Sequence, residues 1–238
     1  MKSLITRLPE FIRARIPELP PPTPRNLWLL LAAAIATQNL GVFQSSQSEH
    51  TTVYALLVWG GALICMEDQL DDLDPKPGLL GFLLGSLLLL LVMLRTSLVL
   101  YSDGMLFILA PLAGLALALL CYPVRQIGRL RDSLLCLLLI PGFGVLMKII
   151  PEMPMSILTA RLSSFWLGIL GFDNVVRGRT VMLPTGGVEV LPACNGVDTI
   201  AQLIGVSIIF LLAFPIRSLF SRVFLLSIAP LIGLACNT

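Results

Sequence analysis

Charged residues are scarce in this sequence. Aspartate, glutamate, lysine and arginine make up 13% of the 238 residues, whereas hydrophobic residues make up 56%. Soluble domains carry about 25% charged residues, and the mean hydropathy here is +0.91. A single water-soluble core cannot hide this much apolar surface, so the sequence predicts that a lipid bilayer is its solvent. The net charge of +2 is too small to indicate a nucleic-acid partner.

Side chains that bind metals are also scarce. The only histidine is His50, and the five cysteines show no CxxC or other metal-ligand spacing. We therefore expect no metal site and no cofactor. Cys194 stands apart, because it precedes an apolar run within a polar stretch. The other four lie in or at the edge of apolar runs, where a thiol usually packs as a small apolar side chain: Cys65, Cys121, Cys136 and Cys236.

Long apolar runs predict an all-α integral membrane protein with about seven transmembrane helices. A membrane-spanning helix needs roughly 20 apolar residues. Residues 27–238 are expected to form one multi-span domain, and residues 1–26 a basic, amphipathic segment with a proline-rich linker. That segment is expected to lie on the membrane surface or to be a disordered tail. The predicted spans are 27–43, 51–66, 79–94, 105–122, 134–150, 197–214 and 223–238.

The distribution of basic residues predicts the orientation. Lysine and arginine accumulate in the cytoplasmic loops of membrane proteins. With seven spans, eleven of the sixteen basic residues fall on the side of the N-terminus and five on the other. The N-terminus is therefore predicted to be cytoplasmic in the plasma (inner) membrane, and the 151–196 loop extracytoplasmic.

The 151–196 loop has two parts before it reaches Cys194. Residues 156–172 predict a helix at the membrane interface, with Trp166 suited to the headgroup layer. "NVVRGRTVMLPTGGVEVLPA" contains two β-branched runs separated by "PTGG", which predicts a short β-hairpin. The side of the helix expected to be apolar comprises Ile157, Leu158, Leu162, Phe165, Trp166 and Ile169.

The position of Cys194 makes it a candidate nucleophile. The chain is expected to become helical within residues 195–198, so that Cys194 falls at or just before the first turn. Unpaired N–H groups and the helix dipole favour an anion there, and a thiolate is the nucleophilic form of cysteine. Asp198 would oppose that negative charge. Arg177 and Arg179 on the hairpin are candidates to approach the thiol or to remain solvated. From the residues alone, a packed and a catalytic Cys194 both stay open.

The stretch "GGVEVLPACNGVDTI" (186–200) resembles the exosortase/archaeosortase family of membrane-embedded cysteine transpeptidases. In that family the cysteine follows a valine and an alanine and precedes a small residue and glycine. Val190, Ala193, Cys194, Asn195 and Gly196 match these positions. The asparagine stands where serine or alanine is commoner, and with the acidic "MEDQLDDLD" loop it points to the cyanobacterial (cyanoexosortase A-like) branch.

The resemblance implies a function. Exosortases act on exported proteins that end in a sorting signal of PEP-CTERM type: a short Pro-Glu-Pro-like motif, a membrane span and a basic tail. The cysteine attacks a peptide bond near the outer membrane surface and forms a thioester, which an amine or water resolves. Cys194 is thereby expected to be catalytic, with exported signal-bearing proteins and membrane lipid as partners and no nucleic acid.

Two further family residues lack counterparts. The family's arginine follows an asparagine at Asn-x-x-Arg spacing, and its histidine lies in the span after that. Asn237 and Thr238 match the start of the motif, but no residue here matches the arginine or the histidine. The sequence is thus expected to be a truncated member. A non-enzymatic scaffold, a transport-type protein and a signal-binding pseudoenzyme stay open as alternatives.

Overall fold

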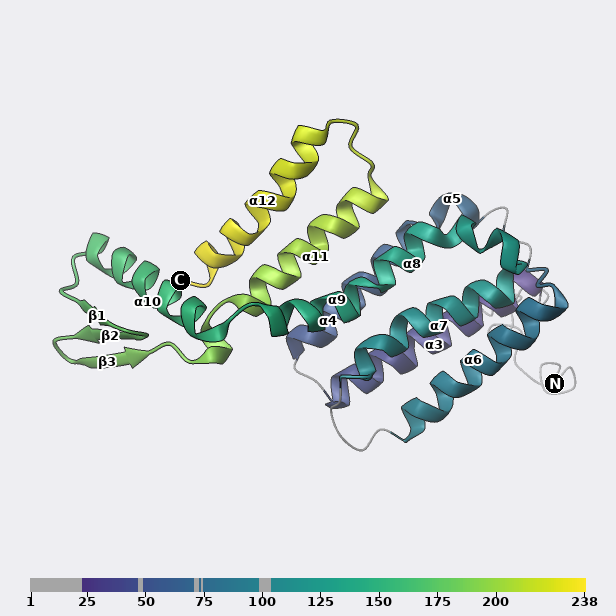
Figure 1. Cartoon of the computed structure of the whole chain (residues 1–238), viewed down its shortest axis with the longest axis horizontal. Helices are drawn as coiled ribbons and strands as arrows, with labels where there is room; N and C mark the ends of the chain where they lie inside the picture. The colour runs from purple at the N-terminus through teal and green to yellow at the C-terminus, as the bar shows by residue number, and fades with distance from the viewer. Residues whose placement is uncertain (1–22, 47–48, 71–72, 74, 99–103) are drawn as a thin grey trace, which may run out of the picture.

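The computed structural model describes residues 23–46, 49–70, 73, 75–98 and 104–238. Residues 1–22, which hold most of the predicted amphipathic segment, lie outside this part. The described chain is helical apart from one small sheet (Figure 1). The elements are α3 (Pro24–Ser46), α4 (Glu49–Ile64), α5 (Glu67–Leu70), α6 (Leu79–Ser97), α7 (Leu106–Cys121), η1 (Val124–Leu130), α8 (Arg131–Leu137), α9 (Leu139–Ile149), α10 (Glu152–Ile169), β1 (Val175–Arg177), β2 (Thr180–Leu183), β3 (Gly186–Glu189), η2 (Pro192–Cys194), α11 (Val197–Ala213) and α12 (Leu219–Cys236).

Apolar helices occur at all seven predicted spans. Within the described residues, four are long and apolar enough to cross a membrane: Pro24–Ser45, Leu79–Ser97, Val124–Ile149 and Leu219–Cys236. The other three, Thr51–Ile64, Leu106–Cys121 and Val197–Ala213, are apolar but shorter. The structure therefore supports a membrane protein with several spanning helices. That all seven cross the bilayer stays a prediction.

Helices α6 and α7 pack closely because glycines line one side of α6. A Cβ atom on Gly81 would lie 2.9 Å from the carbonyl oxygen of Leu119, and one on Gly85 would lie 3.0 Å from that of Ala116. Residues four apart share a helix face, and small residues at this spacing let membrane helices approach each other. The leucine-rich remainder of α6 is exposed, as expected of a surface that faces lipid.

Two large polar side chains inside the bundle, Trp28 and Tyr54, find backbone partners. The indole Nε1 of Trp28 donates to the carbonyl oxygen of Leu117 (3.0 Å), and the Tyr54 hydroxyl donates to that of Leu139 (3.3 Å). Such pairing is needed where no water can satisfy polar groups. These contacts tie α3 to α7 and α4 to α9.

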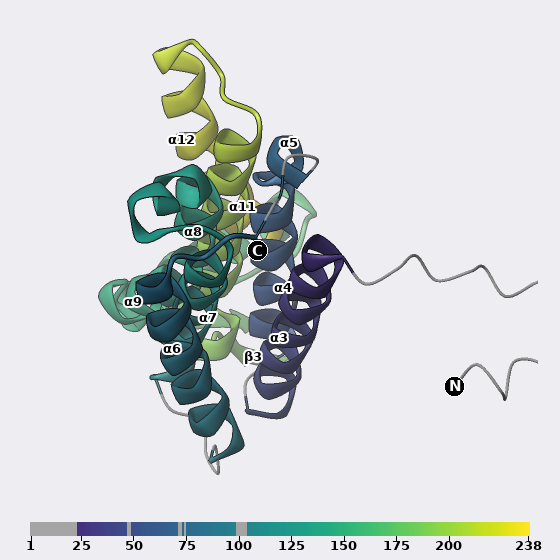
Figure 2. The ribbon, with the colours of Figure 1, turned by 90° about the vertical axis from the view of Figure 1, so that its right-hand side faces the viewer.

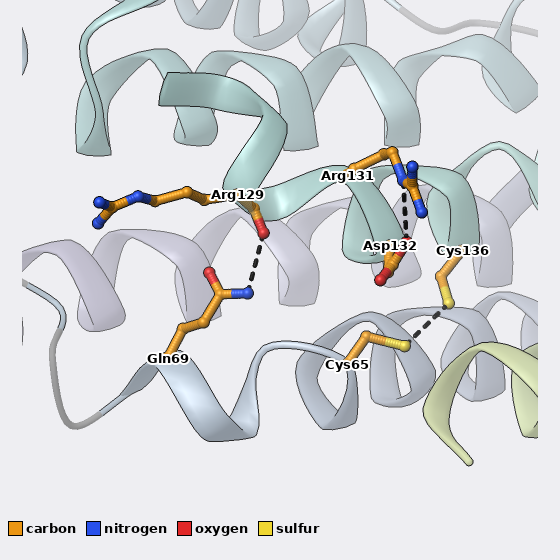
Figure 3. Close-up of polar contacts among 6 residues, drawn as sticks. All are labelled: Cys65, Gln69, Arg129, Arg131, Asp132 and Cys136. Carbon is orange, nitrogen blue, oxygen red and sulfur yellow. Dashed lines mark hydrogen bonds and ion pairs between the residues drawn. The ribbon is translucent and has the colours of Figure 1, made fainter. Parts of the chain in front are cut away.

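The cysteines within the apolar runs behave as packed thiols, with one exception. Figure 3 shows Cys65 at the end of α4 facing Cys136 on α8, with 3.6 Å between the two Sγ atoms. Beside them, the Gln69 side chain donates to the carbonyl oxygen of Arg129 (2.9 Å) and links α5 to η1. Cys121 and Cys136 are buried and Cys65 is half-buried, but Cys236, at the end of α12, is exposed.

The predicted hairpin is in fact a three-stranded antiparallel sheet of order β1-β2-β3. The first β-branched run divides at Gly178, whose φ of +62° lies in the left-handed region that favours glycine. The turn at Gly178 and Arg179 sends β2 back along β1. The second turn consists of Pro184 and Thr185 alone, because Gly186 already belongs to β3.

The sheet, α10 and the C-terminus gather at one end of the molecule. In Figure 1 the connection between α7 and α8 lies at the opposite end, and the connection between α11 and α12 lies where these two helices are farthest from the sheet. Helices α11 and α12 run side by side, with α12 on the outside of the bundle (Figures 1 and 2). The end of α12 therefore returns to the place where α11 begins.

Candidate active site around Cys194

Cys194 is presented at the start of α11, as the sequence predicts. It is the last residue of the short η2 turn, its side chain is exposed, and its N–H donates to the carbonyl oxygen of Leu191 (2.9 Å). Two residues later, Gly196 is the N-cap of α11 with a φ of +82°. Cys194 thus lies just before a helix N-terminus with its side chain exposed.

Asn195 anchors the segment that carries the thiol. It is 3% exposed, and its side-chain Oδ1 accepts the N–H of Val197 (3.0 Å). Its carbonyl oxygen accepts the hydroxyl of Thr159 on α10 (2.9 Å). The first turn of a helix has N–H groups without intrahelical partners, and a side-chain oxygen just before it satisfies one of them. An alanine at position 195 would leave the Val197 N–H without this acceptor.

The end of α12 contacts the same segment. The Asn237 side chain donates through Nδ2 to the carbonyl oxygen of Cys194 (3.0 Å). A Cβ atom on Gly196 would lie 2.8 to 3.0 Å from three atoms of that asparagine. Glycine is therefore required at 196 for its positive φ and for this close approach. The Asn237 side chain, matched in sequence only to the start of a motif, here supports the backbone of Cys194.

The hydroxyl-bearing side of helix α10 is its buried side. Ser156 and Thr159 are 1% and 2% exposed, whereas Trp166 and Ile169, on the side predicted to be apolar, are 47% and 60% exposed. The Ser163 hydroxyl approaches the carbonyl oxygen of Thr238 (3.5 Å). The serine and threonine spacing of three and four residues marks one helix face, so this signal was present in the sequence and was missed.

Arg177 and Arg179 were candidates to approach the Cys194 thiol, but the structure places them elsewhere. Arg179 forms an ion pair with Glu189 of β3 (2.5 Å). Arg177 is on β1, so β2 lies between it and the strand that leads to Cys194. Asp198 is half-buried in the first turn of α11. Among the described residues, no group of three or more metal-binding side chains could hold an ion.

Thr159→Val is expected to loosen the thiol segment. The change keeps the shape of the side chain but leaves the buried carbonyl oxygen of Asn195 without its donor, a loss of about 1–2 kcal/mol that raises local opening roughly 5- to 30-fold. Amide hydrogen exchange of residues 192–197 measures this opening. Ser163→Ala, one turn further along α10, removes only a contact at the 3.5 Å limit and is the matched control. Equal exchange in both variants would show that Thr159 does not anchor the segment.

Comparison with known proteins gave a match to one family model. No curated protein and no solved structure matches the chain. The family model described as transmembrane exosortase matches residues 43–238. This range contains every described element from α4 to α12, with the sheet and Cys194. The chain therefore belongs to the transmembrane exosortase family.

Proposed function

We propose that the chain is a membrane-embedded cysteine peptidase and transpeptidase with Cys194 as its nucleophile. Membership of the exosortase family suggests a membrane sorting transpeptidase. The observation that carries the proposal for this chain is the environment of Cys194. The thiol is exposed just before a helix N-terminus, while Asn237 and Thr159 donate to the carbonyl oxygens of Cys194 and Asn195. A fixed backbone with a free side chain is what a nucleophile needs.

The proposed reaction has two steps at one carbonyl carbon. The thiolate Sγ of Cys194 adds to the carbonyl of the scissile peptide bond, and the resulting tetrahedral species expels the amine as the carbon–nitrogen bond breaks. The leaving amine takes up a proton from water, and a thioester to Cys194 remains. An amine acceptor or water then attacks the thioester carbonyl, transfers the acyl group and releases the thiol.

The substrates proposed are exported proteins with C-terminal sorting signals of PEP-CTERM type. The protein is proposed to lie in the plasma (inner) membrane of a cyanobacterium, with Cys194 on the extracytoplasmic side. The excess of basic residues on the side of the N-terminus supports this orientation. A signal that emerges from the membrane on the outer side would meet the thiol at the lipid boundary.

We further propose that residues 1–238 on their own are limited by proton transfer. No residue matches the family's arginine and histidine. A general acid for the leaving amine contributes roughly 10²- to 10⁴-fold in rate, and a donor to the developing oxyanion about 10²- to 10³-fold. Without them, cleavage of an amide is expected to be too slow to observe.

An activated substrate separates the nucleophile from its acid–base partners. A synthetic peptide with a Pro-Glu-Pro-type motif and a C-terminal thiophenyl ester needs no proton on its leaving group. We expect it to acylate Cys194 in the 238-residue chain, seen as a mass increase that hydroxylamine removes. The same peptide with an ordinary amide bond is expected to remain intact.

Cys236 provides the matched control, since it is the other exposed thiol described. Cys194→Ala is expected to abolish acylation and Cys236→Ala to leave it unchanged. Equal acylation of both thiols would mean that Cys194 has no special reactivity, and the chain would then be a signal-binding or scaffold protein. Cys194-dependent cleavage of the amide peptide would overturn the proton-transfer proposal.

A further inference from the structure

Within the described residues, one edge of strand β3 has no partner strand. It is the last strand in the order β1-β2-β3, and all four of its residues are exposed. Helix α10 packs against β1 and β2. Figure 1 shows β3 on the side of the sheet that faces away from α10. The free edge of β3 is therefore open to another chain.

The register identifies the backbone groups on this edge. Val190 donates its N–H to the carbonyl oxygen of Arg179 (2.9 Å), and Val188 is opposite Val181. In an antiparallel ladder, alternate residues direct both backbone groups toward the same neighbour. Residues 186, 188 and 190 therefore bond to β2. Gly187 and Glu189 direct their N–H and C=O groups outward.

Strand β3 carries neither lysine nor proline, two residues that often protect a strand edge. Soluble sheets protect their edges with lysine, proline, bulges or a covering element, because an open edge pairs readily with another strand. Strand β3 is "GGVE", and the carboxylate of Glu189 is engaged by Arg179 rather than free. The two glycines also leave the edge unobstructed by side chains. These features suit a strand that receives a partner.

The same strand leads directly to the nucleophile. Cys194 follows Glu189 by five positions, a span of at most about 17 Å in extended chain. We propose that the free edge of β3 binds an extended segment of the substrate polypeptide as a fourth strand, and so delivers the scissile bond to Cys194. The proposal rests on the proposed function and adds the mode of recognition. Backbone pairing supplies affinity in this mode, and side chains on alternate residues supply specificity.

Site-directed cross-linking tests the pairing independently of the chemistry. Val188→Cys is introduced into a Cys194→Ala, Cys236→Ser chain, and single cysteines are moved residue by residue along the sorting signal of an exported reporter. Copper–phenanthroline with dioxygen then oxidises neighbouring thiol pairs to disulfides. A strand paired with β3 alternates its side chains between two faces. We therefore expect the cross-linking yield to alternate with a period of two residues.

A backbone variant tests the hydrogen bonds. Glu189→Pro removes the outward N–H without affecting the ladder to β2, and proline is tolerated at such edge positions. It is expected to lower cross-linking roughly three- to ten-fold, as loss of one hydrogen bond predicts. Glu189→Val also loses the ion pair with Arg179 but keeps the N–H, so its yield is expected to match that of the parent.

Three results would overturn the proposal. They are cross-linking without a two-residue period, equal yields in Glu189→Pro and Glu189→Val, and a disulfide only between two copies at position 188. The last would assign the edge to a second copy of this chain. Acylation of Cys194 by the activated peptide together with any of these results would leave the proposed function standing. Periodic cross-linking without acylation would support strand pairing as the binding mode and contradict the proposed enzymatic function.

Discussion

A membrane-impermeant maleimide added to intact cells is expected to modify Cys194 rapidly and to leave Cys121 unmodified. Cys194 is exposed, whereas Cys121 is fully buried at the end of α7. A buried thiol reacts only when the structure opens locally, and an opening free energy of about 3 kcal/mol already slows the reaction by roughly 100-fold. The experiment uses Cys236→Ser, because the second exposed thiol lies near the same end of the molecule.

An exposed cysteine at the other end is needed to report the orientation, since Cys121 is shielded on either side of the membrane. Arg217→Cys places one in the connection between α11 and α12, where residue 217 is exposed. With Cys194 extracytoplasmic, this cysteine reacts only after the membrane is permeabilised. The reverse pattern, with residue 217 labelled from outside and Cys194 protected, would show that the topology is inverted. Cys194 would then have no access to exported proteins.

Gly85→Leu is expected to separate α6 from α7 and to destabilise the bundle strongly. The new side chain would meet the Ala116 carbonyl oxygen and the side chains of Leu119 and Leu120, each 3.0 Å from its Cβ position. A backbone oxygen cannot rotate away as a flexible side chain can. Overpacking of this kind costs typically 1–3 kcal/mol and occasionally more, and we expect about 3 kcal/mol. Thermal unfolding in detergent measures the loss as a lower Tm.

Gly142→Leu in α9 is the matched control for this prediction. A Cβ atom at Gly142 would meet nothing within 4 Å. Leucine is also a better helix former than glycine, by up to about 1 kcal/mol. The control is therefore expected to keep or slightly raise the Tm. Equal Tm values for the two variants would show that α6 and α7 are not held together through Gly85.

The sequence predicted much of the site because several of its signals are local. The length and apolarity of each run located the helices, and the polar stretch before residue 197 located Cys194 at a helix start. The division of the β-branched stretch was missed because Gly178 allows a tight turn that interrupts the first run. The exposure of Cys236 was also missed, because α12 packs on the rest of the bundle with only part of its surface.

Which side of each helix faces inward was decided by the tertiary structure. In a bilayer both the core side and the lipid side of a helix are apolar, so hydrophobic periodicity does not distinguish them. In helix α10, which is not among the candidate spans, apolarity pointed to the wrong side: the buried side carries Ser156 and Thr159, and the apolar side is exposed.

The composition and the spacing of apolar residues predicted a multi-helix membrane protein with Cys194 at the start of a helix. Both depend on residues that are neighbours along the chain. The support of that cysteine by Thr159 and Asn237, and the open edge of β3, arose only on folding. These features join segments 36 to 43 residues apart or depend on strand register. Contacts at such separations are fixed by packing geometry, which no local pattern of residue types encodes.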